Sequence, residues 1–196
     1  MRGCIFIMLL LYGCQLKSVE LPMLSYKIDD SGNKVPYKIT YEGFTNQFGE
    51  PFTTTNIQGK VVVSNFFFTR CPSICPPMRN ELIKIASAIG DRDDFTIVSH
   101  TIDPENDTEA VLKTYFEDAG ITSKQWQLVR TTLDKTHDQA FMYMTAFKPN
   151  MDGSDFFLHS SYVTLVDKDQ NIRGFYDILM ADDIIRLKKD IQILLD

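Results

Sequence analysis

The most informative part of the sequence is GKVVVSNFFFTRCPSICPPMRNELIKIASAIG, residues 59–90. Its first ten residues form a continuous apolar, β-rich run, which predicts a strand buried on both faces of a sheet. From Cys71 onward apolar residues recur every three or four positions, the spacing of one helix face. Pro76 and Pro77 suit the first turn of that helix, where proline breaks no hydrogen bond. The stretch therefore predicts a strand running into a helix, with Cys71 and Cys75 at the junction.

Strand and helix signals alternate after this junction. We expect strands at FTIVSHTID (95–103), WQLVR (126–130), SYVTLVD (161–167) and IRGFYD (172–177), and helices at TEAVLKTYFEDAG (108–120, with Asp107 as N-cap), DKTHDQAFMYMTAF (134–147) and about 181–195. Before the junction, residues 38–52 predict short extended segments around glycine turns. The order predicts an α/β protein, a sheet covered by helices with its last strands antiparallel. A strand that runs into a helix beginning with a cysteine pair resembles the thioredoxin arrangement. We therefore expect a thioredoxin-like fold with a central mixed sheet flanked by helices and an N-terminal β extension.

The N-terminus has the pattern of a secretion signal and not of a folded element. In MRGCIFIMLLLYGC one arginine precedes an apolar run from Ile5 to Tyr12, and Gly13 stands before Cys14. The pattern resembles a bacterial lipoprotein signal, which implies cleavage after residue 13 and lipidation of Cys14. An uncleaved anchor is the alternative, although the run is shorter than the ~20 apolar residues of a permanent span. Both interpretations put the domain outside the cytoplasm, anchored to a membrane.

The chain thus divides into a signal peptide at 1–13, a tether at 14–36 and one globular domain at 37–196. The tether mixes Ser, Pro, Gly and charged residues without periodicity, which is typical of a linker. With 44% hydrophobic and 23% charged residues, the remainder can bury a substantial core. A net charge of -6 with scattered basic residues argues against a nucleic-acid partner, because phosphate binding needs clustered Lys and Arg.

Only one pair of cysteines, Cys71 and Cys75, remains in the domain, because Cys4 lies in the signal and Cys14 is assigned to lipid. A helix N-terminus stabilises thiolate, which improves both a nucleophile and a metal ligand. Redox enzymes of the thioredoxin fold carry C-x-x-C, whereas Cys71 and Cys75 form C-x-x-x-C. Positions four apart on a helix share a face, so we expect the two sulfurs to converge on a shared ion. A disulfide between them stays open as an alternative.

A third donor precedes the strand expected at 161–167. Thioredoxin-type oxidoreductases place a cis-proline there, but no proline follows Pro149, and His159 occupies this region instead. Two thiolates and one imidazole suit copper or zinc, and the soft sulfurs match Cu(I) while the imidazole also permits Cu(II). A structural zinc site has four ligands, and the domain has no further cysteine. The sequence therefore favours copper.

Three segments also carry a resemblance to a known family. They are GKVVVSNFFFTRCPSICP (59–76), IDPENDT (102–108) and His159 before SYVTLVDKDQNIRGFYD, and on these segments residues 37–196 resemble the Sco/SenC family of copper-binding, thioredoxin-fold assembly factors of cytochrome c oxidase. The resemblance implies copper ligands at Cys71, Cys75 and His159. It also implies a copper donor and, as recipient, the copper-bearing subunit of cytochrome c oxidase or another cuproprotein.

Two functional hypotheses follow. The first is a membrane-tethered copper metallochaperone, in which Cys71, Cys75 and His159 hold copper and pass it on by ligand exchange. The second is a thiol–disulfide oxidoreductase that reduces a partner's cysteines, with Cys71 and Cys75 cycling and His159 tuning their pKa. A purely structural disulfide and a loop role for His159 are further alternatives.

Other candidate side chains have structural interpretations. His100 alternates along an expected strand and His137 lies in an expected helix, so both are interpreted as packing or surface residues. We expect the aspartates of 102–108 to shape a loop and the methionines at helical spacing to fill the core, although thioether sulfur could attract Cu(I). These residues are Asp103, Asp107, Met78, Met142 and Met144.

Overall fold

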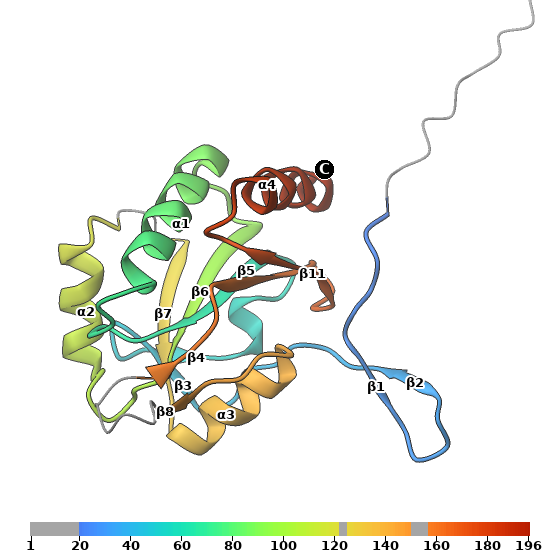
Figure 1. Cartoon of the computed structure of the whole chain (residues 1–196), viewed down its shortest axis with the longest axis horizontal. Helices are drawn as coiled ribbons and strands as arrows, with labels where there is room; N and C mark the ends of the chain where they lie inside the picture. Colours follow the sequence, from blue (N-terminus) through green and yellow to red (C-terminus); the bar gives the residue numbers. More distant parts are fainter. Residues whose placement is uncertain (1–19, 122–124, 150–156) are drawn as a thin grey trace, which may run out of the picture.

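The computed structural model of the chain describes residues 20–121, 125–149 and 157–196. Within these residues the centre of the molecule is a seven-stranded mixed sheet with helices on both sides (Figure 1). Its strands are β3 (Phe44–Asn46), β4 (Pro51–Phe52), β5 (Val61–Phe67), β6 (Phe95–Thr101), β7 (Trp126–Arg130), β10 (Tyr162–Val166) and β11 (Ile172–Asp177). They lie in the order β11-β10-β5-β6-β7-β3-β4. The expected α/β architecture with a central mixed sheet is confirmed.

The middle of the sheet is parallel and its edges are antiparallel. β5 pairs with β6, and β6 with β7, in parallel register, whereas β10 runs antiparallel to β5 and β3 antiparallel to β7. Every residue of β5 is buried, as expected for a strand covered on both faces. Because parallel strands end at the same edge, the loops after β5 and β6 lie next to each other.

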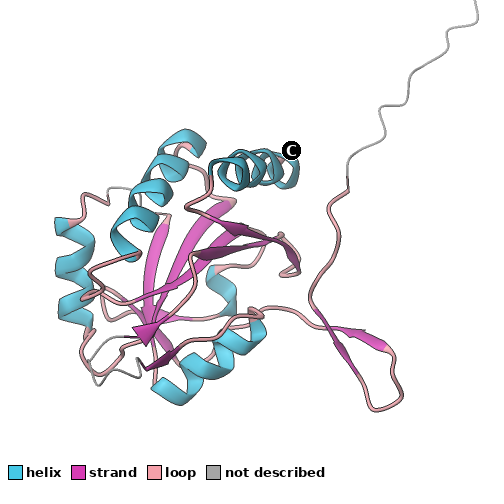
Figure 2. Cartoon of the chain, viewed as in Figure 1, coloured by secondary structure: helices cyan, strands magenta, loops and turns pink. Residues whose placement is uncertain are grey.

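Four helices cover the sheet in the described part of the chain, and Figure 2 shows them in cyan around the magenta strands. α1 and α4 lie on one side and α3 on the other (Figure 1). Each of α1 and α4 buries residues three or four positions apart, which is the amphipathic spacing. The helix expected at 181–195 is confirmed. The bounds are α1 Cys75–Ile89, α2 Glu109–Asp118, α3 Leu133–Met142 and α4 Ala181–Leu195, with a short 3₁₀ helix, η1, at Thr54–Asn56.

Two expectations about helix starts were wrong. α1 begins at Cys75, so Cys71 lies in the turn before it and not on the helical face; the reason is Pro72, whose ring disfavours helical backbone at the preceding residue. The N-cap of α2 is Thr108, whose hydroxyl accepts the N–H of Val111 at 3.4 Å. Asp107, expected to be that cap, directs its carboxylate into the protein instead.

The helix expected at 134–147 is shorter than its sequence pattern. α3 ends at Met142, and Met144 follows with φ of +52°. Left-handed backbone cannot continue a right-handed helix. The expectation that Met144 fills the core was therefore also wrong, since its side chain is 45% exposed.

The described part of the expected tether is partly folded. Residues 20–36 contain an antiparallel hairpin of β1 (Tyr26–Ile28) and β2 (Lys34–Pro36), which stands beside the body of the molecule (Figure 1). Before the hairpin, the N–H of Leu24 donates to the carbonyl of Ile172 at 2.8 Å, and buried Ser25 accepts the N–H of Ile172 through Oγ at 3.2 Å. Arg173 donates to the carbonyl of Leu21 at 2.7 Å. Residues 21–25 therefore pack on the β10–β11 hairpin.

The expected signal peptide, with Cys4 and the lipidation residue Cys14, lies outside the described residues. No helix in the ranges that the structure describes combines the length and apolar character needed to cross a membrane.

Candidate metal centre

Cys71, Cys75 and His159 come together at the edge of the sheet where β5 and β6 end. One donor atom from each residue lies within 4.8 Å of the other two. Nε2 of His159 lies 3.2 Å from Sγ of Cys75 and 3.9 Å from Sγ of Cys71. The fold thus brings together Cys71 and His159, which are 88 residues apart in the sequence.

The two cysteines are held by different elements. Cys75 is the first residue of α1 and is 4% exposed. Cys71 lies in the turn after β5, where its N–H donates to the carbonyl of Phe68 at 3.2 Å, and it is 7% exposed. Both are free thiols. The two sulfurs therefore converge as expected, but from a turn and the first residue of a helix and not from one helical face.

The surroundings make the two thiols unequal. Burial tends to raise the pKa of Cys71, but hydrogen bonds from the backbone N–H groups of Cys75 and Ser73 outweigh it, so the pKa is lowered. Burial raises the pKa of Cys75 far above its usual range, and the negative charges of Cys71 and Asp107 add to that effect. In the metal-free protein at neutral pH, Cys71 is thus the more readily ionised group and Cys75 remains a thiol.

His159 follows a short antiparallel pair formed by β8 (Lys148–Pro149) and β9 (Phe157–Leu158), which the sequence analysis did not anticipate. Nδ1 of the imidazole lies 3.1 Å from the carbonyl oxygen of Ser160. A carbonyl only accepts, so Nδ1 carries the proton and Nε2 presents its lone pair to the sulfurs. Burial also lowers the pKa of His159, which keeps the imidazole neutral. Phe68 packs edge-on against the ring at 5.8 Å.

Oxidoreductases of this fold carry a peptide-receiving cis-proline at the entrance to the strand that corresponds to β10, and this chain has no proline after Pro149. The described residues contain no cis peptide bond. The chain enters β10 through Ser160 and Ser161, directly after His159. His159 thus stands at the entrance to β10, where these oxidoreductases carry the proline.

The other histidines do not join the centre. His100 is buried in β6 and stacked against Phe66 at 4.6 Å and Tyr41 at 5.5 Å, so its interpretation as a packing residue is confirmed. Burial lowers the pKa of His100 to about 3. His137 is exposed on α3 and stacks on Phe147 at 4.2 Å.

Of the methionines, Met78 is 1% exposed and fills the core beneath α1, as expected. Met142 is partly buried against the same core.

Asp103 and Asp107 have a second role, at the turn that carries Cys71, which their sequence pattern did not predict. The carboxylate of Asp107 accepts hydrogen bonds from the N–H and the hydroxyl of Thr69, at 3.1 and 2.5 Å. Asp103 forms an ion pair with Arg70 at 2.8 Å. The available signal was the position of the two aspartates after a buried strand parallel to β5, since adjacent parallel strands end side by side. Both aspartates do shape their loop, as expected, but they also hold the cysteine turn.

The arrangement has two chemical capabilities. Two sulfurs and one neutral imidazole nitrogen at 3.2 to 3.9 Å can surround one soft metal ion. The same two thiols are near enough to form a disulfide after a small adjustment of the turn.

Comparison with known proteins agrees with this geometry. The family model described as SCO1/SenC matches residues 31–195. A SCO2-like protein of Rickettsia prowazekii is 30% identical over 152 residues, covering 74% of this chain and 72% of the relative.

Two solved structures are similar to the whole fold. A SCO1/SenC family lipoprotein of Bacillus anthracis has a TM-score of 0.73 at 23% identity, over 89% of this chain and 98% of that one. ScoI of Bradyrhizobium japonicum, solved with copper bound, has a TM-score of 0.66 at 22% identity, over 81% and 98%. These likenesses confirm the expected thioredoxin-like fold.

Proposed function

The chain belongs to the SCO1/SenC family, and from this membership we propose that it is a copper metallochaperone for the assembly of cytochrome c oxidase. Copper is its cargo, held by Sγ of Cys71, Sγ of Cys75 and Nε2 of His159. The observation that carries the proposal is the convergence of these three donors within 4.8 Å. The copper-bound ScoI structure, with the same fold, supports the choice of metal.

The donor set fits copper on chemical grounds. Bonds from a comparable ion such as zinc to these donors are about 2.3 Å for sulfur and about 2.0 Å for nitrogen. Donors that share one ion therefore lie roughly 3.5 to 4 Å apart, close to the 3.2 and 3.9 Å that separate Nε2 from the sulfurs. Two thiolates prefer Cu(I), and the imidazole lets the site hold Cu(II) as well.

Transfer to the recipient proceeds by ligand exchange. Both cysteines are almost fully buried, whereas His159 is partly exposed. A ligand atom of the recipient protein reaches the copper most easily from the side of His159. It replaces Nε2 before the bonds from copper to the two sulfurs break. By family resemblance, the recipient is the copper-bearing subunit of cytochrome c oxidase or another cuproprotein.

The proposed location is the outer side of a membrane, through lipid on Cys14 after removal of residues 1–13. The support is the signal pattern in the sequence and the description of the Bacillus anthracis relative as a lipoprotein. Residues 14–20 would then link the lipid to the folded part of the chain.

A second candidate function is reduction of a partner's disulfide, favoured by the unequal cysteines. Cys71, with the lowered pKa, attacks a partner disulfide and forms a mixed disulfide. Cys75 then gives up its proton and displaces the partner thiol, so that the partner gains two electrons and two protons while Cys71 and Cys75 become a disulfide. The two functions are compatible, because cysteines of a recipient site must be reduced before copper can enter.

An anaerobic Cu(I) titration of the reduced protein tests the main proposal. We expect one tight equivalent in the wild type and an affinity at least about 10-fold weaker in His159→Ala. His137→Ala is the matched control, because His137 is exposed on α3 and contacts Phe147 instead of the centre. Equal affinity of His159→Ala and wild type would remove His159 from the site. A wild type that retains no copper, yet reduces a protein disulfide through Cys71, would make the second function the main one.

A further inference from the structure

Asp107 holds the chain just before the cysteines. Its side chain is fully buried, and its carboxylate lies 3.1 Å from the N–H of Thr69 and 2.5 Å from the hydroxyl of Thr69. A third donor, the hydroxyl of Thr101 at the end of β6, lies 2.5 Å away. Hydrogen bonds to a buried carboxylate are short and strong. They tie residue 69, two positions before Cys71, to the neighbouring strand.

Asp103 supplies a second tie, one residue closer to the metal centre. Its carboxylate pairs with Arg70 at 2.8 Å and also accepts the side-chain amide of Asn106 at 2.8 Å. Asp103 is 4% exposed while the Arg70 side chain is 41% exposed, so this pair is only partly shielded from water. The two residues that precede Cys71 are thus each held by an acid of the 102–108 segment.

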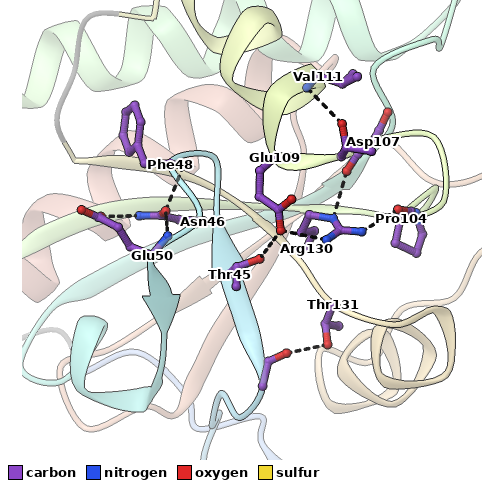
Figure 3. A network of polar contacts seen from close by, with 12 residues as sticks. Thr45, Asn46, Phe48, Glu50, Pro104, Asp107, Glu109, Val111, Arg130 and Thr131 are labelled. Carbon is purple, nitrogen blue, oxygen red and sulfur yellow. Dashed lines mark hydrogen bonds and ion pairs between the residues drawn. The ribbon is translucent and has the colours of Figure 1, made fainter.

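Arg130, the last residue of β7, fixes the backbone of that segment in turn. Figure 3 shows its guanidinium among Pro104, Asp107 and Glu109. It donates to the carbonyls of Asp107 and Pro104 at 3.1 and 2.9 Å, and it pairs with Glu109 at 2.9 Å. A chain of polar contacts therefore runs across the ends of β7, β6 and β5 and finishes at the cysteine turn.

We propose that Asp107 is a positioning residue for the metal centre: through Thr69 it sets the place of Cys71 Sγ relative to Cys75 and His159. The role deepens the proposed copper function and rests on it. The physical reason is that Cys71 lies outside α1, so the helix that fixes Cys75 does not fix Cys71. The Asp107 carboxylate supplies that restraint, and Asp103 reinforces it through Arg70.

Asp107→Asn and Thr69→Val test the role in complementary ways. The amide keeps the size of the side chain but has only one accepting oxygen, so it cannot accept all three donors of Thr69 and Thr101 in their present arrangement. The valine removes the hydroxyl tie and leaves the charge of Asp107 in place, which separates positioning from electrostatics. Asp167→Asn is the matched control, since Asp167 is also buried, accepts two backbone N–H groups and pairs with Arg173, but does so in the turn between β10 and β11.

Three measurements on these proteins decide the matter. They are Cu(I) affinity by competition with a chromophoric chelator, the sulfur-to-copper charge-transfer absorption of the Cu(II) form, and the thermal midpoint of the metal-free protein. We expect Asp107→Asn to bind Cu(I) about 10- to 100-fold more weakly and to shift the absorption band. Thr69→Val should lose about 2- to 10-fold. Asp167→Asn should lower the midpoint and leave both copper readouts at wild-type values.

The inference is overturned if Asp107→Asn and Thr69→Val keep wild-type affinity and absorption while their midpoints fall as in Asp167→Asn. A metal-free readout separates this failure from failure of the copper function. The Cys71–Cys75 disulfide equilibrium in a dithiothreitol redox buffer depends on the same geometry, and we expect a shift of about 10-fold in Asp107→Asn. If the wild type bound no copper, that shift would still support positioning by Asp107, and an unchanged equilibrium would refute it.

Discussion

His159 and His100 show how the same residue type takes opposite roles in one fold. The Nδ1 of His159 is occupied by the carbonyl of Ser160, which leaves Nε2 open towards the sulfurs. In His100 both nitrogens are engaged, because Nε2 lies 2.9 Å from the hydroxyl of Tyr41 and Nδ1 lies 3.2 Å from the carbonyl of Asn65. An imidazole binds a metal through the lone pair of its unprotonated nitrogen, and the groups that face Nε2 of His159 are two sulfurs that can bind the same ion. The partners of the ring therefore distinguish the candidate ligand from the core residue.

Burial of His100 predicts a loss of stability in mild acid. The pKa of His100 is about 3 in the folded protein and about 6.5 in the unfolded chain. Below about pH 6.5 the unfolded chain therefore gains a proton that the folded protein does not, and stability falls by up to about 1.4 kcal/mol per pH unit. His100→Gln, which does not titrate, should show a smaller decrease in the free energy of urea unfolding between pH 6.5 and 5.

His137→Gln serves as the control for that experiment, since it makes the same substitution at an exposed position on α3. Parallel pH profiles for wild type and His100→Gln would contradict the assignment of the acid sensitivity to this residue.

The high pKa of Cys75 predicts that copper uptake releases a proton. Burial keeps Cys75 protonated at neutral pH, and a sulfur ligand must be a thiolate. The released proton can be counted by calorimetry in two buffers of different ionisation enthalpy. Apparent affinity should rise by about tenfold per pH unit for each proton released. Cys75→Ser should lose this release, and binding by the wild type with no proton transfer to the buffer would show that Cys75 is already ionised.

The junction of β5 and α1 illustrates what one element contributes. β5 is buried at all seven positions and delivers the chain to the carboxyl edge of the sheet. α1 then begins at Cys75 with prolines in its first turn and buries Met78, Leu82 and Ile85 against the sheet. The N–H groups at the start of α1 face the cysteine turn, where they stabilise a thiolate. Packing of α1 thus determines both the stability of the fold and the position of one ligand.

Ile85→Ala should destabilise the protein by about 2–5 kcal/mol, because Ile85 is fully buried under α1 and its truncation leaves a cavity. Urea unfolding measures this change. Lys84→Ala is the neighbouring control on the exposed side of the helix, where loss of an ion pair with Glu81 costs about 0–1 kcal/mol. Equal midpoints for the two variants would mean that α1 does not pack as described.

On the scale of the whole molecule, the centre draws on segments far apart in the sequence. Cys71 and Cys75 follow β5, the supporting aspartates follow β6, and His159 precedes the antiparallel strand β10. The first two segments meet because parallel strands end together. His159 arrives because β10 pairs with β5 in the opposite direction, so the start of β10 lies beside the end of β5.

The N-terminal contacts predict that the folded unit begins before residue 37. A chain beginning at residue 37 should unfold at lower urea concentration than one beginning at residue 20, with a loss of about 2 kcal/mol or more. The loss comprises the hydrogen bonds of Leu24, Ser25 and Leu21 to β11, at about 0.5–1.5 kcal/mol each, and the packing of Leu21 and Leu24 on the core. Equal stability of the two chains would show that 37–196 is the complete domain, as the sequence pattern indicates.

Features that depend on interactions between neighbouring residues can be predicted from the amino-acid sequence. The β-rich run into β5, the apolar spacing of α1 and α4, and the proline-marked start of α1 depend on residues within a few positions of one another. The same holds for the residue types at the candidate centre, since two cysteines and one histidine already limit the chemistry to soft metals or thiol exchange. These features could be predicted from the chain alone.

Which of these groups come together, and which residues hold them, depends on contacts between distant parts of the chain. Asp107 has the sequence signature of a helix cap. Its carboxylate instead accepts two hydrogen bonds from Thr69, 38 residues earlier, because a buried carboxylate needs hydrogen-bond donors. Residues 21–25 have the sequence pattern of a linker. In the structure Ser25 accepts a hydrogen bond from Ile172, which lies 147 residues later. Neither partner can be inferred from neighbouring residues, because each depends on strands that the fold brings together.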